Sequence, residues 1–175
     1  MNAQIIQVKG NTKLIDIKVE NNTLRTFMVF AQAARETMKY SDNYLYRKAG
    51  VSLIRFIVLK ALSLSEGGLK PTELADWTQT ERHNITTLVD RMTREGLITV
   101  SKNPYDKRSV VVNLTDKGRD TLERSTPIAG EIVDQMMSSI SEKDIAYMER
   151  VMKVMRKNAH QGLVAGGKGP KKKSE

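Results

Sequence analysis

Hydrophobic residues recur at helical spacing along most of this chain and change to strand-like runs in one place. Residues 80–95 predict a helix, because their apolar positions fall at i, i+3, i+4 and i+7 and so form one stripe that faces a core. The stripe consists of Ile85, Leu88, Val89 and Met92. Gly96 follows the last of these residues and is a natural stop for the helix.

A shorter helix is predicted just before this one, beginning at Pro71. Proline suits the first position of a helix because its missing N–H would have no intrahelical partner there. Residues 78–80 are polar and supply a turn, and Thr78 and Glu81 have the spacing of a capping box for the next helix. The two helices and their turn have the pattern of a helix-turn-helix.

Two runs rich in β-branched residues follow, at residues 97–100 and 110–114. The segment between them contains turn-forming Asn, Pro and Asp residues, so the two runs predict a hairpin. A hairpin directly after a helix-turn-helix is a wing. The expected fold class is therefore mainly α with a small β-wing, in which residues 51–114 form a winged helix-turn-helix that binds DNA.

The side of the second helix that faces away from its apolar stripe carries the candidate chemistry. Its side chains can hydrogen-bond base edges or phosphate oxygens, and no aliphatic residue interrupts them. The candidate DNA contacts on this recognition helix are Arg82, His83, Asn84, Thr86, Thr87 and Arg91. An ordinary solvated helix face has the same composition, so it is the hairpin behind the helix that favours DNA.

The tip of the hairpin supplies a second set of candidate DNA contacts. Cations outnumber acids there, which suits a wing that lies on the sugar-phosphate backbone or places an arginine in a narrow minor groove. The candidates are Lys102, Asp106, Lys107 and Arg108. A charged hairpin tip also blocks edge-to-edge pairing of strands, so this set carries weight only beside a polar recognition helix.

Helices are also predicted on both sides of the winged segment. The periodic stretches are residues 22–48, 52–63 and 115–140, and a last helix begins at Ser141. Pro127 is expected to bend or break the third of these helices, because it removes a backbone donor and its ring clashes with the preceding turn.

The stretches ELADWTQTERHNITTLVDRMTREGLI and DKRSVVVNLTDKG, with their separation, resemble the MarR family of bacterial transcriptional regulators over roughly residues 24–158. The resemblance implies that the helix from Thr80 to Glu95 enters the major groove. It also implies that Asp106 orients Arg108 at the minor groove. The LTDKG run, residues 114–118, is similar to the family's entry into a long C-terminal helix.

The same resemblance implies a homodimer in which N- and C-terminal helices of two chains interleave. Residues 22–50 and 115–162 would then form a helical dimerisation region, and a monomeric core with adaptable methionine packing is the alternative. The resemblance further implies a cleft between these helices and the winged unit, often occupied by phenolic or other aromatic compounds. Residues that could line it are Tyr40, Tyr44, Arg55, Phe56 and Trp77, although aromatic residues in such helices also serve as core.

The predicted function is that of a homodimeric, sequence-specific transcriptional regulator, a repressor released by a small and often aromatic ligand. The alternative is a winged-helix module for protein interaction or architectural DNA binding, without an effector. One position departs from the family, since many members carry an arginine where this sequence has Thr87. Arg82 and His83, near the start of the recognition helix, are placed to substitute for that contact.

Composition and charge agree with a nucleic-acid partner and argue against an enzyme. The net charge of +9 favours a polyanion. Residues 70–119 hold nine Lys or Arg against seven Asp or Glu, a net +2, so DNA affinity must come from arrangement more than from bulk charge. No phosphate-binding loop, nucleophile–base set or paired-carboxylate motif stands out. With no cysteine and only His83 and His160, neither a metal site nor a cofactor is expected.

The two ends of the chain carry no recognisable motif. Residues 1–21 form an N-terminal extension in which apolar and polar residues alternate around a Gly-Asn turn. An extended arm or short hairpin is expected there, and a frayed helical extension is the alternative. Residues 163–175 are Gly-rich and basic, which predicts a disordered tail that is either merely solvated or attracts DNA nonspecifically. Without an apolar run of membrane-spanning length or a signal-peptide layout, the protein is expected to be cytoplasmic, with no membrane partner.

Overall fold

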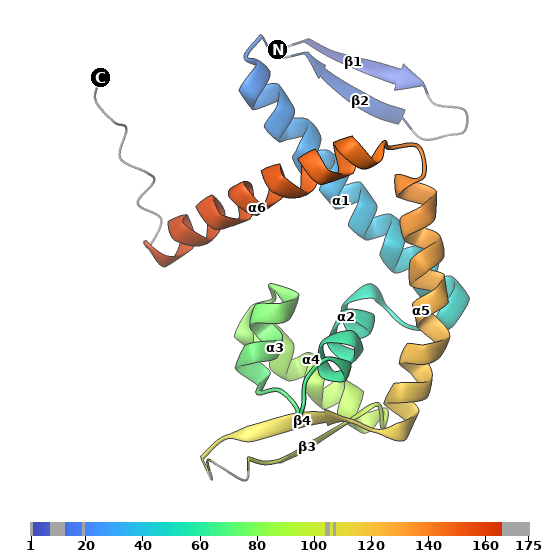
Figure 1. The fold of residues 1–175 in the computed structure, drawn as a ribbon, viewed down its shortest axis with the longest axis vertical. Coiled ribbons are helices and arrows are strands. Elements are labelled where there is room, and N and C mark those ends of the chain that lie inside the picture. Colours follow the sequence, from blue (N-terminus) through green and yellow to red (C-terminus); the bar gives the residue numbers. More distant parts are fainter. Residues whose placement is uncertain (1, 8–12, 19, 104–105, 107, 166–175) are drawn as a thin grey trace. The chain divides into compact units, whose positions relative to one another are not determined.

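The computed structural model describes residues 2–7, 13–18, 20–103, 106 and 108–165. Within these ranges the chain is mostly helical and carries two small antiparallel sheets (Figure 1). It divides into two compact units, residues 1–132 and 133–175, which we describe separately. The predicted fold class, mainly α with a small β-wing, is confirmed.

The first unit contains every element of the winged segment. In chain order its elements are β1 (Asn2–Gln7), β2 (Lys13–Lys18), α1 (Asn22–Ala49), α2 (Leu53–Ser63), α3 (Pro71–Thr78), α4 (Arg82–Arg94), β3 (Ile98–Lys102), β4 (Val110–Leu114) and most of α5 (Asp116–Met137). The second unit contains the end of α5 and α6 (Glu142–Val164). None of the helices in the described ranges combines the length and apolar character needed to cross a lipid bilayer.

The hydrophobic core of the first unit lies where α2, α3 and α4 meet the β3–β4 hairpin (Figure 1). The predicted stripe of α4 faces it: Ile85, Val89 and Met92 are buried, and Leu88 is half-buried against them. The fully buried side chains at the centre are Val58, Leu59, Leu74, Ile85, Met92, Ile98 and Val112. Burying this stripe fixes which side of α4 is left for solvent.

The wing is an antiparallel pair in which Val100 lies opposite Val112 and Lys102 opposite Val110. Leu69, in the loop before α3, forms an isolated antiparallel bridge with Val112 through two backbone hydrogen bonds of 2.8 and 3.1 Å. Because Val112 is completely buried, these bonds tie the wing to the helical core.

The start of α3 follows the sequence prediction, but its connection to α4 does not. Pro71 is the first residue of α3, and the Glu73 carboxylate accepts the backbone N–H of Lys70 at 2.7 Å. The predicted capping box at Thr78 is wrong, because the Thr78 hydroxyl donates to the Leu74 carbonyl within α3. Glu81 caps α4 without a side-chain hydrogen bond.

Pro127 does not break α5, which runs continuously past it. Proline leaves the carbonyl four residues earlier, that of Glu123, without its helical donor. Both residues are exposed, so water can bond that carbonyl and the helix continues. Of the two predicted outcomes, a bend or a break, the break is therefore wrong, because the residue whose carbonyl is freed is exposed.

The N-terminal extension contains a hairpin, as one of the two sequence predictions had it. Strands β1 and β2 pair in antiparallel register, with Asn2 opposite Lys18, so the alternative of a frayed helix is wrong. The expected Gly10-Asn11 turn lies outside the described residues. At the other end, α6 includes Leu163 and Val164, which the predicted tail contained, and the rest of that tail from residue 166 lies outside the described residues.

Candidate nucleic-acid interface

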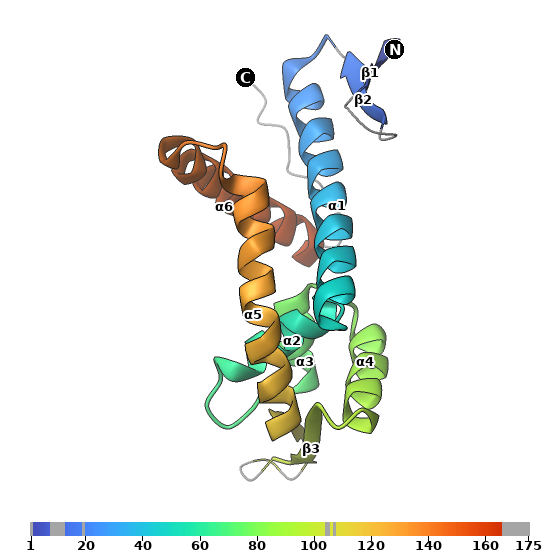
Figure 2. The ribbon, with the colours of Figure 1, turned by 90° about the vertical axis from the view of Figure 1, so that its right-hand side faces the viewer.

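Helix α4 presents its predicted polar side to solvent. The six candidate contacts Arg82, His83, Asn84, Thr86, Thr87 and Arg91 are all exposed. Ile85, Val89 and Met92 anchor the opposite side in the core. Helix α4 and the wing lie next to each other in both views of the first unit (Figures 1 and 2). The structure thus brings the two predicted sets of side chains onto neighbouring elements.

The two candidate threonines of α4, Thr86 and Thr87, have their hydroxyls turned to the helix backbone. Thr86 Oγ1 donates to the Arg82 carbonyl at 3.0 Å, and Thr87 Oγ1 donates to the His83 carbonyl at 3.2 Å. A hydroxyl that donates in this way keeps lone pairs to accept from a base amino group, while the threonine methyl suits contact with a thymine methyl. Thr87 therefore offers an acceptor oxygen and a methyl group, whereas the arginine that many MarR family members carry at this position offers a charged donor.

The first turn of α4 combines a cation-rich start with one acidic neighbour. His83 Nδ1 lies 3.7 Å from Glu81 Oε2, and both side chains are largely exposed. Glu81 is the residue before α4, and the helix itself has no acid in its first turn. An acid at this end suits the positive end of the helix dipole, and Arg82, His83 and Asn84 follow it with donors.

The wing tip is built on backbone hydrogen bonds around Asp106. Its carboxylate Oδ1 accepts the backbone N–H of Arg108 at 3.0 Å, and its own N–H donates to the Asn103 carbonyl at 3.3 Å. The Arg108 N–H holds the pKa of Asp106 below its ordinary value, with a smaller effect from the Ser109 side chain. Asp106 therefore fixes the backbone from which Arg108 projects.

The candidate wing contacts Lys102, Asp106 and Arg108 are exposed, and Lys107 lies outside the described residues. The sequence resemblance implied that Asp106 orients Arg108. In the structure this link runs through the Arg108 backbone amide. Such an Asx-type turn leaves the guanidinium available for an external anion.

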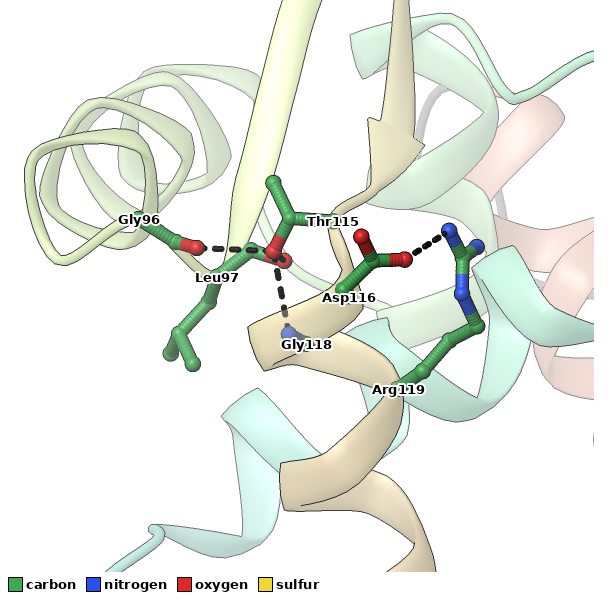
Figure 3. Close-up of polar contacts among 6 residues, drawn as sticks. All are labelled: Gly96, Leu97, Thr115, Asp116, Gly118 and Arg119. Atoms are coloured by element: carbon green, nitrogen blue, oxygen red, sulfur yellow. Dashed lines mark hydrogen bonds and ion pairs between the residues drawn. The ribbon is translucent and has the colours of Figure 1, made fainter.

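The LTDKG run forms a compact joint between the end of α4 and the start of α5 (Figure 3). Thr115 Oγ1 donates to the carbonyls of Gly96 and Leu97, at 2.7 and 3.0 Å, and accepts the backbone N–H of Gly118 at 3.0 Å. Asp116 and Arg119 pair at 2.8 Å in the same turn. Sequence reasoning recognised this run as a helix start but missed that it also holds the end of α4.

The candidate ligand residues lie on three helices, α1, α2 and α3. Tyr40 and Tyr44 lie one helical turn apart on α1 with ring centroids 5.6 Å apart, and the Tyr44 hydroxyl donates to Glu131 of α5 at 2.8 Å. Arg55 is paired with Glu95, Phe56 packs on the core, and Trp77 on α3 is 53% exposed. Among the described residues, no group of His, Asp or Glu is arranged to hold a metal ion.

Comparison with protein families and curated proteins identifies relatives that span most of the chain. The model of the MarR family matches residues 49–109, which cover α2 to the wing. The HTH-type transcriptional regulator MhqR of Bacillus subtilis is 25% identical over 139 residues, which are 79% of this chain and 94% of that protein. The HTH-type transcriptional repressor NicR of Pseudomonas putida is 31% identical over 102 residues, 57% of this chain and 64% of that protein.

Solved structures share the fold as well. Sco3205, a MarR family transcriptional regulator from Streptomyces coelicolor solved in complex with DNA, has a TM-score of 0.73 and 23% identity. The match covers 81% of this chain and 91% of that one. CouR from Rhodococcus jostii RHA1, solved bound to p-coumaroyl-CoA, has a TM-score of 0.69 and 14% identity over 78% of this chain and 95% of that one.

The sequence and structural matches agree on one assignment. The family model covers the helix-turn-helix and the first strand of the wing, and the curated relatives match a longer part of the chain. These relatives are transcriptional regulators and not enzymes, in keeping with the polar face of α4. Residues 49–109 thus carry the winged helix-turn-helix of the MarR family, and the chain shares the fold of solved MarR family transcriptional regulators.

Proposed function

We propose that this protein is a homodimeric repressor that binds a specific operator, with α4 in the major groove and the wing on the adjacent minor groove. The observation that carries the proposal is the division of α4 into two sides. One side is buried in the core, and the other presents exposed hydrogen-bonding side chains next to a cationic hairpin tip. Direct readout of bases needs such a helix, and a wing adds contacts to the backbone.

The proposed contacts divide by position along the helix and wing. We assign base contacts to the N-terminal half of α4, where recognition helices usually meet base edges. These residues are Arg82, His83, Asn84 and Thr86. We assign contacts near the phosphates to Thr87, Arg91 and Lys102, and minor-groove contact to Arg108 with Asp106 and Lys107 as wing neighbours.

Exposed apolar side chains support the proposed dimer. On α1 they are Leu24, Phe27, Phe30 and Met38, and on α6 they are Tyr147, Val151, Met152 and Val154. An exposed apolar face of a helix is a candidate interaction surface. A second copy of the chain would cover it, with residues 22–50 and 115–162 as the dimerisation region. A two-fold dimer then requires an operator with two related half-sites.

We further propose that a small aromatic ligand releases the repressor from DNA. The support is the paired rings of Tyr40 and Tyr44 on α1 and the likeness of the fold to CouR, which was solved with an aromatic acyl-CoA. Tyr40 and Tyr44, whose rings pair on α1, are the first positions to test. Since the proposed partner is chromosomal DNA, the protein would act in the cytoplasm.

Selection of bound fragments from the native genome tests this function. Fragments that bind should share a pseudo-palindrome, and the protein should bind that duplex far more tightly than a random duplex of equal length at one salt concentration. Equal affinity for the two duplexes would contradict sequence-specific regulation and leave architectural binding. No binding to either duplex would favour a protein-interaction module.

A further inference from the structure

The C-terminal end of the recognition helix is held by side chains from two other helices. Glu95 is the residue that ends α4, and its carboxylate pairs with Arg55 of α2, Nη2 to Oε1, at 2.7 Å. An acid is unfavourable at this end of a helix, where the dipole is negative. The ion pair with Arg55 therefore offsets the unfavourable interaction of Glu95 with the helix dipole.

The backbone at the same point is held by the first turn of α5. Lys117 Nζ donates to the Glu95 carbonyl at 2.8 Å, and Thr115 Oγ1 takes the next two carbonyls, those of Gly96 and Leu97. Backbone carbonyls just after a helix also need hydrogen-bond partners when they are covered by other elements. Here three successive carbonyls are bonded by side chains of α5 and its N-cap.

The joint leaves little room for movement between α4 and α5. A Cβ built on Gly118 would meet the Leu97 carbonyl oxygen at 2.1 Å, so the first turn of α5 lies directly against the chain that leaves α4. Further along α5, Glu131 accepts the Tyr44 hydroxyl of α1. Helix α5 is thus bonded to the recognition helix at one end and to α1 at the other.

We infer that Arg55 and Lys117 are positioning residues for DNA recognition, which fix the direction of α4 relative to α2 and α5 and thereby the half-site separation that the dimer reads. This inference rests on the proposed function, since separation has meaning only for a dimer on DNA. The two recognition helices of the dimer must enter two successive major grooves at once. A small reorientation of each helix changes their separation, which then no longer matches the separation of the half-sites. A partly exposed ion pair adds little to global stability, so variants of it should fold and the spacing preference can be measured on them.

A matched pair of substitutions in α5 tests the inference. Lys117→Met removes the bond to the end of α4, whereas Arg119→Met removes an equal charge that pairs with Asp116 in its own helix. Affinity is measured at one salt concentration for the operator and for operators with one base pair inserted or deleted between the half-sites. Lys117→Met should lower operator affinity several-fold more than Arg119→Met and should reduce the preference for the native spacing. Equal losses with unchanged spacing preference would overturn the inference.

A double-mutant cycle on the Arg55–Glu95 ion pair provides a second test in case Lys117→Met fails to fold. Arg55→Gln and Glu95→Gln should each reduce the spacing preference, and the double variant should lose no more than either single variant. Additive losses, or spacing preferences like that of the unmodified protein, would overturn the inference. If the unmodified protein does not prefer its operator to random duplex, the proposed function fails; if it does and the variants keep its spacing preference, only this inference fails.

Discussion

Gly118 in the first turn of α5 lies against the backbone of Leu97, so closely that a Cβ at residue 118 would come within 2.1 Å of the Leu97 carbonyl oxygen. No rotamer change can relieve this contact, because the neighbouring atom belongs to the backbone. The glycine of LTDKG is therefore required by packing between the wing and α5. Gly118 thus allows α5 to approach the backbone of Leu97, a role that its position within a helix would not predict.

Gly118→Ala should destabilise the protein by about 1–3 kcal/mol, the usual cost of forcing extra volume into a packed site. Gly130→Ala is the matched control in the same helix, since a Cβ there meets nothing within 4 Å. Alanine is a better helix former than glycine, so the control should gain roughly 0.5–1 kcal/mol. Urea unfolding of both variants measures the difference, and equal effects would contradict the close approach at Gly118.

Much of the winged unit could be predicted because its signals are local. The spacing of Ile85, Val89 and Met92 sets the buried side of α4, and Pro71 marks the start of α3. The prediction from local spacing failed where one side chain has two possible hydrogen-bond partners. Thr78 could cap α4 or bond back to Leu74, and the sequence does not reveal which bond forms.

The contacts that hold the recognition helix could not be predicted, because they join residues far apart in the chain. Arg55 and Glu95 are separated by 40 positions. Arg55 lies among the apolar residues of α2 and Glu95 follows the polar end of α4, so neither position points to the other. From the sequence, Lys117 is indistinguishable from a solvated cation, and only the fold shows that it bonds the Glu95 carbonyl. The predicted DNA contacts were easier to choose, since exposure and hydrogen-bonding chemistry follow from helical periodicity.

Asp106 should act through its carboxylate oxygen rather than through its charge. Asp106→Asn keeps an oxygen for the Arg108 N–H and should retain most DNA affinity, whereas Asp106→Ala should lose affinity because the tip loses this bond. The measurement is the dissociation constant of each variant on one operator. Loss of affinity in the asparagine variant equal to that in the alanine variant would mean that the charge itself is needed.

The pH dependence of this site has a defined sign. The pKa of Asp106 in the folded protein lies below its ordinary value of 3.8, chiefly because of the Arg108 N–H. A lowered pKa means that the carboxylate's contribution is fully present above that ordinary value and is lost as the pH falls through the folded pKa. The Asp106 carboxylate should therefore stay ionised at neutral pH, and its titration by NMR should have a midpoint below 3.8. A midpoint above this value would contradict the wing geometry.

Arg108→Ala should weaken binding to most duplexes and reduce the salt dependence of binding. Loss of one phosphate-neutralising contact lowers the slope of log affinity against log salt by roughly 0.9. If Arg108 enters a narrow minor groove, the loss should also be larger on A·T-rich flanks. Arg124→Ala on α5 is a control of equal charge. Matching slopes for Arg108→Ala and the unmodified protein would remove Arg108 from the interface.

Arg82→Ala and Asn84→Ala should each cost about 1–3 kcal/mol on the operator if the side chain makes a good bidentate base contact. Binding to random duplex should fall less, because phosphate contacts remain. Arg94→Ala, in the last turn of α4, serves as a control that removes a charge away from the proposed base contacts. Equal losses on operator and random duplex for both test variants would move sequence reading to His83, Thr86 or DNA shape.

The central claim is that two copies of α4 read the major groove of one operator. Methylation protection of guanine N7 tests it most directly, because this atom lies in the major groove. The account predicts two protected tracts related by two-fold symmetry, with centres about one helical turn or ~34 Å apart, or a multiple of this distance. A single protected tract, or binding that leaves major-groove guanines fully reactive, would contradict it.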